Sequence, residues 1–103
     1  MSEEVKAPTD CKSMADVRRG VDATDRALLD LLDRRFGYMK AAARIKTDRA
    51  SVRDEQRKAA VIAAARRDAQ ARSLPANDIE QFWELLVESS IAFEFEEWDR
   101  IRT

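Results

Sequence analysis

The apolar positions from Met14 onward recur at every third or fourth residue, which is the spacing of a helix with one buried stripe. No Gly-Pro break interrupts this pattern before about Thr47, so it predicts a first helix of about 34 residues, or ~50 Å. Two shorter helices of one small chain cannot cover a stripe of that length. We therefore expect a second copy of the chain to pack against it.

Two shorter helices are predicted after the first. The segment SVRD, from Ser51 to Asp54, matches a capping box and places the start of a second helix that ends near Arg72. A third helix follows from about Pro75 to Arg100, because proline disfavours helix at the residue before it and is tolerated in a first turn. The predicted fold is all-α, with one long helix and two shorter ones.

The first 13 residues have a different character. They are polar, contain Pro8 and show no periodicity, so we expect residues 1–13 to form a flexible N-terminal arm and residues 14–103 to form one helical domain. They lack a basic segment followed by an apolar run, and no stretch of the chain approaches the ~20 apolar residues that span a bilayer. We therefore expect a cytoplasmic protein that does not bind membranes.

Composition narrows the chemistry. Nineteen Lys and Arg residues oppose 20 Asp and Glu residues, so the net charge of -1 offers no bulk attraction to nucleic acid. The chain has no His and a single cysteine, Cys11, which argues against Ser-His or Cys-His nucleophiles and against zinc or copper sites. No glycine-rich phosphate loop is present. We expect neither metal nor cofactor, and a site built from carboxylates and cations.

Cations interrupt the buried stripe of the first helix. Its positions are Arg18, Val21, Asp25, Leu28, Leu32, Arg35, Met39, Ala42 and Lys46. Arg18, Arg35 and Lys46 should therefore point inward. A single cation at such a position can set the register or extend its head to water, but three of them need acidic partners or an anionic ligand.

The spacing of these cations indicates a composite site. Arg35 and Lys46 are ~16 Å apart along the helix axis and each side chain reaches ~6 Å, so a compact polyanion fits between them. Arg18 lies ~25 Å from Arg35, too far to share that ligand. If Arg18 serves the same kind of site, an antiparallel second chain must supply it. This predicts a helical homodimer that binds a small anionic molecule.

The third helix carries the opposite charge in its stripe. Glu94 interrupts the apolar series Val87, Ile91 and Trp98. It can form a salt bridge with Arg35 or Lys46, or it can be a buried carboxyl that keeps its proton and donates a hydrogen bond. Ser90, one turn earlier, can contact a ligand or simply save space between helices.

Two residues near the start of the second helix also have alternative interpretations. Asp54 can be only the last member of the capping box, and Arg57 only its ion-pair partner three residues on. Together with the inward cations, they can instead complete a ligand site. The sequence leaves both interpretations open.

The arrangement of these residues resembles the all-helical chorismate mutase family over about residues 14–100. The resemblance rests on Arg18 in DVRRGVDATDRALLDLLDRR, Arg35 in RRFGYMKAAARIK, Lys46, and the segments VRDEQR and ELLVESSIAFEFE. It implies an intertwined three-helix homodimer with two active sites and no cofactor. The implied reaction is the rearrangement of chorismate to prephenate, which needs no acid, base or nucleophile.

The resemblance also implies roles for the cations. Arg18 would reach across the dimer to one substrate carboxylate, and Arg35 would hold the other. Lys46 would bind a carboxylate and the ether oxygen of the substrate. Arginine and lysine suit this task because they bind carboxylates and stay charged.

Four further positions receive roles from the resemblance. Asp54 would lie at the ring hydroxyl, Arg57 would support that end of the pocket, and Ser90 would lie by the ring carboxylate. Glu94 would hydrogen-bond the ether oxygen. Because a charged carboxylate would repel that oxygen, we expect activity to decline as the pH rises. Lys58 departs from the family, since bacterial mutases often have Glu there, near the ring hydroxyl.

Two rival functions stay open. The segments PTDCKSMADVRRGVD and IAFEFEEWDR also resemble isochorismate-pyruvate lyases, which split isochorismate into salicylate and pyruvate. Asp54 favours the mutase, because we expect a lyase to lack that carboxylate. The third possibility is a non-catalytic helical dimerisation module whose cations are paired only with acidic side chains.

Overall fold

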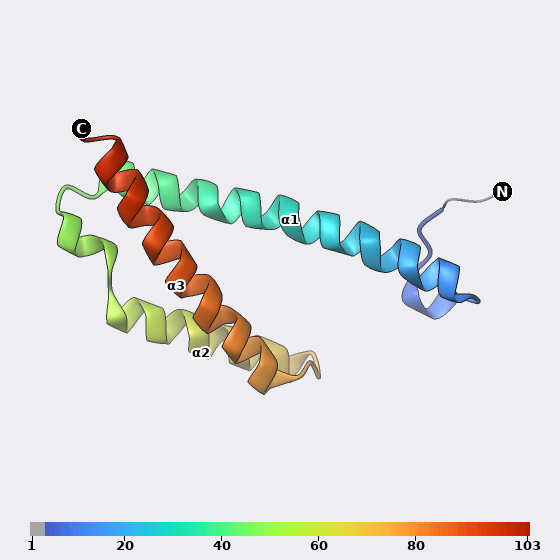
Figure 1. The fold of residues 1–103 in the computed structure, drawn as a ribbon. Helices are drawn as coiled ribbons and strands as arrows, with labels where there is room; N and C mark the ends of the chain where they lie inside the picture. Colours follow the sequence, from blue (N-terminus) through green and yellow to red (C-terminus); the bar gives the residue numbers. More distant parts are fainter. Residues whose placement is uncertain (1–3) are drawn as a thin grey trace. The chain divides into compact units, whose positions relative to one another are not determined.

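The computed structural model describes residues 4–103 and is helical throughout its regular part (Figure 1). In chain order its elements are the short 3-10 helix η1 (Pro8–Asp10), helix α1 (Met14–Ile45), the 3-10 helix η2 (Arg49–Val52), and helices α2 (Glu55–Ala71) and α3 (Ala76–Arg100). The predicted all-α class, with one long and two shorter helices, is confirmed. None of the described helices has the length and apolar character needed to cross a membrane.

The chain divides into two compact units, Met1–Arg35 and Phe36–Thr103. In the first unit, Asp16 ties the N-terminal segment to the first turn of α1. Its carboxylate accepts hydrogen bonds from the Lys12 amide at 3.0 Å, Lys6 Nζ at 3.3 Å and Arg19 Nη2 at 2.9 Å. These donors, the Lys12 amide foremost, lower the pKa of Asp16 to about 2.

The segment expected to be a flexible arm makes several contacts with the first turn of α1. Residues 8–10 form η1, and Lys6 and Lys12 hold the segment against α1 through Asp16. The sequence pattern did not indicate this attachment, because a single acidic residue 10 positions from Lys6 carries no periodic signal. Residues 1–3 of the expected arm lie outside the described residues.

The part of α1 in the first unit leaves much of its apolar surface uncovered. Val21 and Leu28 of the predicted stripe are 52% and 53% exposed, and Leu29 and Leu31 are exposed as well. Among residues 4–103, no large side chain is fully buried. An apolar helix face of this kind is stable in water only when another surface covers it.

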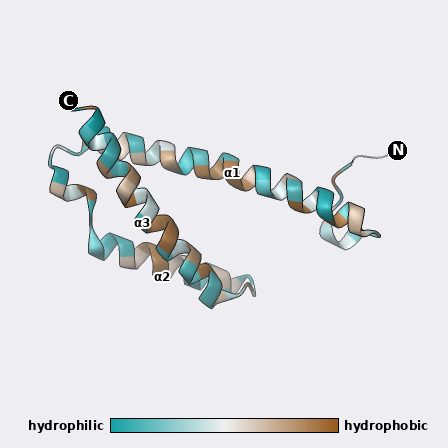
Figure 2. Ribbon diagram, in the orientation of Figure 1, coloured by the Kyte–Doolittle hydropathy of each residue, from teal (hydrophilic) through white to brown (hydrophobic). Residues whose placement is uncertain are grey.

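The second unit has a small core between η2, α2 and α3, and the latter two helices lie side by side (Figure 1). The buried residues at its centre are Val52, Ile62, Val87 and Ile91. Four partly buried side chains pack around them: Val61, Trp83, Phe95 and Trp98. Figure 2 shows that the middle turns of α3 are strongly hydrophobic. This core holds the face of α3 that also carries Ser90 and Glu94.

The junction between α2 and α3 confirms the predicted break. Arg72 caps α2, and Ser73 adopts a left-handed conformation with φ of 56°. The Leu74 amide donates to the Ala69 carbonyl at 2.8 Å and the Ser73 amide to Gln70 at 3.2 Å. These two bonds form a Schellman motif, which satisfies carbonyls at the end of α2. Helix α3 then begins directly after Pro75.

The predicted start of α2 at Ser51 is wrong. The Asp48 side chain accepts from the Ala50 amide and starts η2, so Ser51 lies within that 3-10 turn. Asp54 itself is the N-cap of α2, and its Oδ1 accepts from the Arg57 amide at 3.0 Å. Either residue suits a cap, and the earlier turn at Asp48 leaves the role to Asp54.

Candidate functional site

Lys46 and Glu94 form the centre of the candidate site. Lys46 directly follows α1, Glu94 lies on α3, and Lys46 Nζ is 2.7 Å from Glu94 Oε2. Glu94 is 4% exposed, whereas the Lys46 side chain is 30% exposed. A carboxylate this buried needs a cation beside it. The sequence allowed either Arg35 or Lys46 as the partner of Glu94. In the structure the partner is Lys46.

Two aromatic side chains of α3 contact the part of α1 in the second unit and the Lys46 that follows it. The Phe36 and Phe93 rings meet edge to face, with centroids 4.9 Å apart. Trp98 Nε1 donates to the Lys46 carbonyl at 3.1 Å. On this part of α1 the fully buried residue is Ala43 rather than its neighbour Ala42 of the predicted stripe.

Ser90 lies one turn before Glu94 on α3 and is buried. Its hydroxyl donates to the Leu86 carbonyl at 2.7 Å. A serine within a helix commonly bonds backward in this way. Ser90 and Glu94 therefore place two polar groups on the buried side of α3, among apolar side chains.

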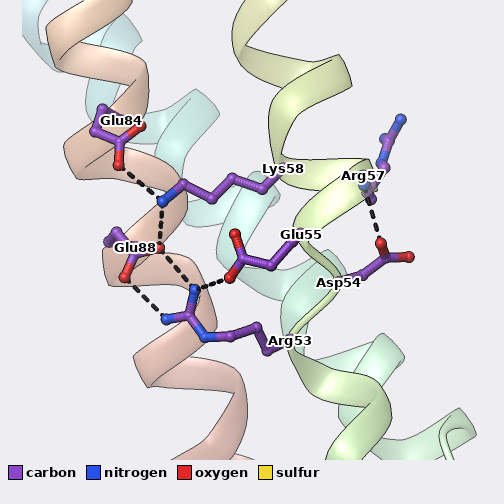
Figure 3. Close-up of polar contacts among 7 residues, drawn as sticks. All are labelled: Arg53, Asp54, Glu55, Arg57, Lys58, Glu84 and Glu88. Carbon is purple, nitrogen blue, oxygen red and sulfur yellow. Dashed lines mark hydrogen bonds and ion pairs between the residues drawn. The ribbon is translucent and has the colours of Figure 1, made fainter.

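Asp54 and Arg57 occupy the exposed first turn of α2. It is the Arg57 amide, not its guanidinium, that Asp54 Oδ1 accepts, so the expected side-chain ion pair is replaced by a helix cap. In Figure 3 the Arg57 side chain extends away from Lys58. One carboxylate oxygen of Asp54 thus serves the fold, and the Arg57 guanidinium reaches towards solvent.

Arg18 and Arg35 both lie on α1 within the first compact unit. Arg18 is exposed, whereas Arg35 is half-buried. Two of the predicted site residues are thus in the first unit. The second unit holds the other five, and among these the structure joins Lys46 to Glu94 directly.

A network of charged residues between α2 and α3 was not predicted (Figure 3). Lys58 Nζ lies 2.7 Å from Glu84 and 2.8 Å from Glu88, while Arg53 bonds Glu88 with both of its terminal nitrogens, at 2.9 and 3.1 Å, and Glu55 at 2.8 Å. Arg53, and then Lys58, lower the pKa of Glu88 to about 2. The sequence feature that could have indicated this network is the pair Glu84 and Glu88, one turn apart on α3.

The ion pairs with Glu84 and Glu88 account for the lysine at position 58, which departs from the family pattern. Its ammonium is taken up by two carboxylates of α3, which is a role in holding two helices together. In Figure 3 it extends from α2 towards α3 between Glu84 and Glu88. Lys58 therefore helps to hold α2 against α3 within the second unit.

Comparison with known proteins shows which family this chain is similar to. Residues 17–95 match the family model of chorismate mutase type II. The chain is also 32% identical over 98 residues to the isochorismate pyruvate lyase of Pseudomonas aeruginosa, across 95% of this chain and 97% of that protein. The matched range contains every candidate site residue: Arg18, Arg35, Lys46, Asp54, Arg57, Ser90 and Glu94.

Proposed function

The chain belongs to the type II chorismate mutase family, and from this membership we propose that it rearranges chorismate to prephenate. The observation that carries the proposal is the ion pair between Lys46 and the buried Glu94. It places a hydrogen-bond donor with a positive charge beside a carboxyl group in a partly dry environment. Such a pair suits an ether oxygen on which negative charge develops.

The reaction needs no proton transfer and no covalent intermediate. In chorismate the carbon–oxygen bond of the enolpyruvyl ether breaks while a carbon–carbon bond forms to the ring, and the electrons move in one cycle. Charge accumulates on the ether oxygen in the transition state. A Lys46 ammonium donating to this oxygen lowers the barrier, because the donor is already in place and little water must reorganise.

Glu94 has two roles in this proposal. Without substrate, its carboxylate balances the Lys46 ammonium, which is the contact seen in the second unit. With substrate bound, a protonated Glu94 donates a second hydrogen bond to the ether oxygen. A charged Glu94 would instead repel that oxygen, so the rate should decline as the pH rises.

The other cations hold the substrate in its compact, reactive conformer. Arg35 binds one carboxylate of the dianion, and Arg18 from a second copy of the chain binds the other. Guanidinium groups suit this task, because their planar forks bind carboxylates through two hydrogen bonds. Restricting the flexible enolpyruvyl chain in this way supplies a large part of the acceleration.

The proposed role of Arg18 requires a homodimer, and the exposed face of α1 supports one. The exposed apolar side chains of α1, Val21 and Leu28 among them, provide the surface that a second copy would cover. The scarcity of buried large side chains among residues 4–103 supports the same assembly, because a single copy buries little apolar surface. A second copy thus stabilises the fold and completes the site.

Three residues complete the proposed substrate contacts. Asp54 accepts from the ring hydroxyl, Arg57 supports that end of the pocket, and Ser90 lies by the ring carboxylate. Asp54 can serve the helix cap with one carboxylate oxygen and the hydroxyl with the other. These assignments follow the positions of the residues in the family pattern.

The second candidate reaction is the elimination of pyruvate from isochorismate. The similarity to an isochorismate pyruvate lyase over nearly the whole chain favours it. In this reaction a ring hydrogen moves to the enolpyruvyl methylene as the carbon–oxygen bond breaks, which leaves salicylate and pyruvate. Because capping alone accounts for Asp54, this residue separates the two reactions less sharply than its sequence position indicated.

Separate incubation of the purified protein with chorismate and with isochorismate tests the proposal. Prephenate from chorismate supports the mutase. Salicylate and pyruvate from isochorismate, without prephenate from chorismate, would establish the lyase instead. A non-catalytic module would turn over neither compound and would gain no thermal stability from a dicarboxylate analogue of the transition state.

A further inference from the structure

The C-terminal end of α1, directly before Lys46, has no left-handed glycine among the described residues to cap it. The last four carbonyls of an α-helix have no partner within the helix, and many helices satisfy them with a left-handed glycine. No glycine in the described part of the chain has a positive φ, and Ser73, which does, ends a different helix. The carbonyls around Lys46 therefore depend on partners from elsewhere in the chain.

Arg102, the penultimate residue, supplies these partners. Its Nη1 donates to the Ala43 carbonyl at 3.0 Å, and its Nη2 donates to the Lys46 carbonyl at 2.7 Å. Ala43 lies in the last turn of α1 and Lys46 directly follows it, so the two carbonyls belong to the end of the helix and to the residue just after it. The rigid fork of the guanidinium group can bridge both, and its positive charge is favourable at a helix C-terminus.

The Arg102 side chain is itself held in place by Trp98. Its guanidinium carbon lies 4.1 Å from the centre of the Trp98 ring, and Nη1 also donates to the Trp98 carbonyl at 3.2 Å. Trp98 Nε1 donates to the same Lys46 carbonyl that Arg102 contacts. Both lone pairs of that oxygen are thus used, and Lys46, Trp98 and Arg102 form a closed set of contacts.

We propose that Arg102 is a positioning residue for Lys46. By fixing the backbone of Lys46, it keeps the ammonium 2.7 Å from Glu94, where it can donate to the ether oxygen in the proposed function. The effect of Arg102 on catalysis rests on the proposed function, whereas its hydrogen bonds to the end of α1 do not. A loss of positioning should lower the rate of the chemical step more than the binding of substrate.

The test compares Arg102→Ala and Arg102→Lys with a matched control, Arg100→Ala. Arg100 lies two residues earlier and bonds Glu97 at 2.6 and 2.9 Å. Arg102→Lys keeps the charge at the helix end but replaces the planar fork with a single ammonium. All three changes affect exposed residues near the end of the chain, so the overall fold should persist.

Amide hydrogen exchange tests the positioning without any assay of turnover. The Lys46 amide donates to the Ala42 carbonyl at 2.9 Å, which is the last hydrogen bond of α1. Arg102→Ala should speed exchange at this amide by about 10-fold, Arg102→Lys by less, and Arg100→Ala not at all. Unchanged exchange in Arg102→Ala would overturn the proposal.

Kinetics with whichever substrate the wild-type protein converts test the catalytic consequence. We expect kcat of Arg102→Ala to fall about 10- to 100-fold while KM stays within about 3-fold, with partial recovery in Arg102→Lys. Faster exchange with an unchanged kcat would overturn positioning. If the wild-type protein converts neither chorismate nor isochorismate, the proposed function fails, and exchange alone decides whether Arg102 holds Lys46.

Discussion

Lys46 Nζ lies 2.7 Å from Glu94 Oε2, although 48 residues separate the two in the chain. The cation proposed to act on the substrate is therefore already paired before any substrate arrives. This pairing keeps a buried carboxylate from being left without a counter-charge. It also means that binding of a dianion must change the contacts of Lys46, the protonation of Glu94, or both.

Replacement of Glu94 by glutamine tests this coupling. The amide of Glu94→Gln donates a hydrogen bond at every pH, so we expect its rate to vary less with pH than the wild-type rate. The wild-type rate should decline as the pH rises, because only a protonated carboxyl can donate. The comparison requires pH profiles of kcat for both proteins. A flat wild-type profile would show that Glu94 does not donate to the ether oxygen.

A mixing experiment tests whether each site takes Arg18 from a second copy. Arg18→Ala and Lys46→Ala should each be nearly inactive alone. In an equimolar mixture half of the dimers are mixed and each contains one intact site, so about a quarter of wild-type activity should return. Activity no higher than the mean of the two variants would contradict a shared site. Subunit exchange can be followed with a tag on one variant.

The ion pairs of Glu88 should affect acid stability. Arg53, and then Lys58, lower its pKa from the ordinary value of 4.5 to about 2. The folded-state value lies below the unfolded one, so this stabilisation is present above about pH 4.5 and is lost as the pH falls towards about 2. Denaturant unfolding at several pH values should therefore show a shallower acid decline for Glu88→Gln than for the wild type.

Glu84→Gln is the matched control for Glu88→Gln. Glu84 also lies on α3 and also contacts Lys58, but the bidentate bond from Arg53 goes to Glu88. The acid decline of the Glu84 variant should stay closer to that of the wild type. If the curves of Glu88→Gln and the wild type run parallel, these ion pairs do not set the acid stability.

Ser73 offers a test of the helix junction. It holds the left-handed position of the Schellman motif, where a side chain is disfavoured and glycine is not. Ser73→Gly should raise the free energy of unfolding by up to about 1 kcal/mol, since relief of strain outweighs the added freedom of the unfolded chain. Ser73→Ala keeps a Cβ atom and should bring no such gain. Equal stabilities of the two variants would contradict the strain.

Most of the fold could be predicted from local signals. The apolar repeat located the start of α1 at Met14, and Pro75 located the break before α3. The start of α2 could not be found in this way, because both Ser51 and Asp54 suit an N-cap. The choice between them depends on the turn that Asp48 begins upstream.

The inward placement of Lys46 and Glu94 could be predicted from the sequence, but their pairing could not. The interrupted stripes identified Lys46 and Glu94 as inward charges, yet the sequence allowed either Arg35 or Lys46 as the partner of Glu94. That choice depends on which turn of α3 lies against the end of α1. The contact of Arg102 with Lys46 joins residues 56 positions apart, and no periodic pattern reports it.

The most direct test of the central claim is the rate of prephenate formation from chorismate by Lys46→Gln. Glutamine keeps much of the side-chain length but removes the positive charge, so we expect kcat to fall at least about 100-fold. Arg66→Gln is the control, because Arg66 pairs with Glu80 between α2 and α3 and should keep nearly the wild-type rate. Circular dichroism must show that both variants are folded. Prephenate formation by folded Lys46→Gln at the wild-type rate would contradict the account.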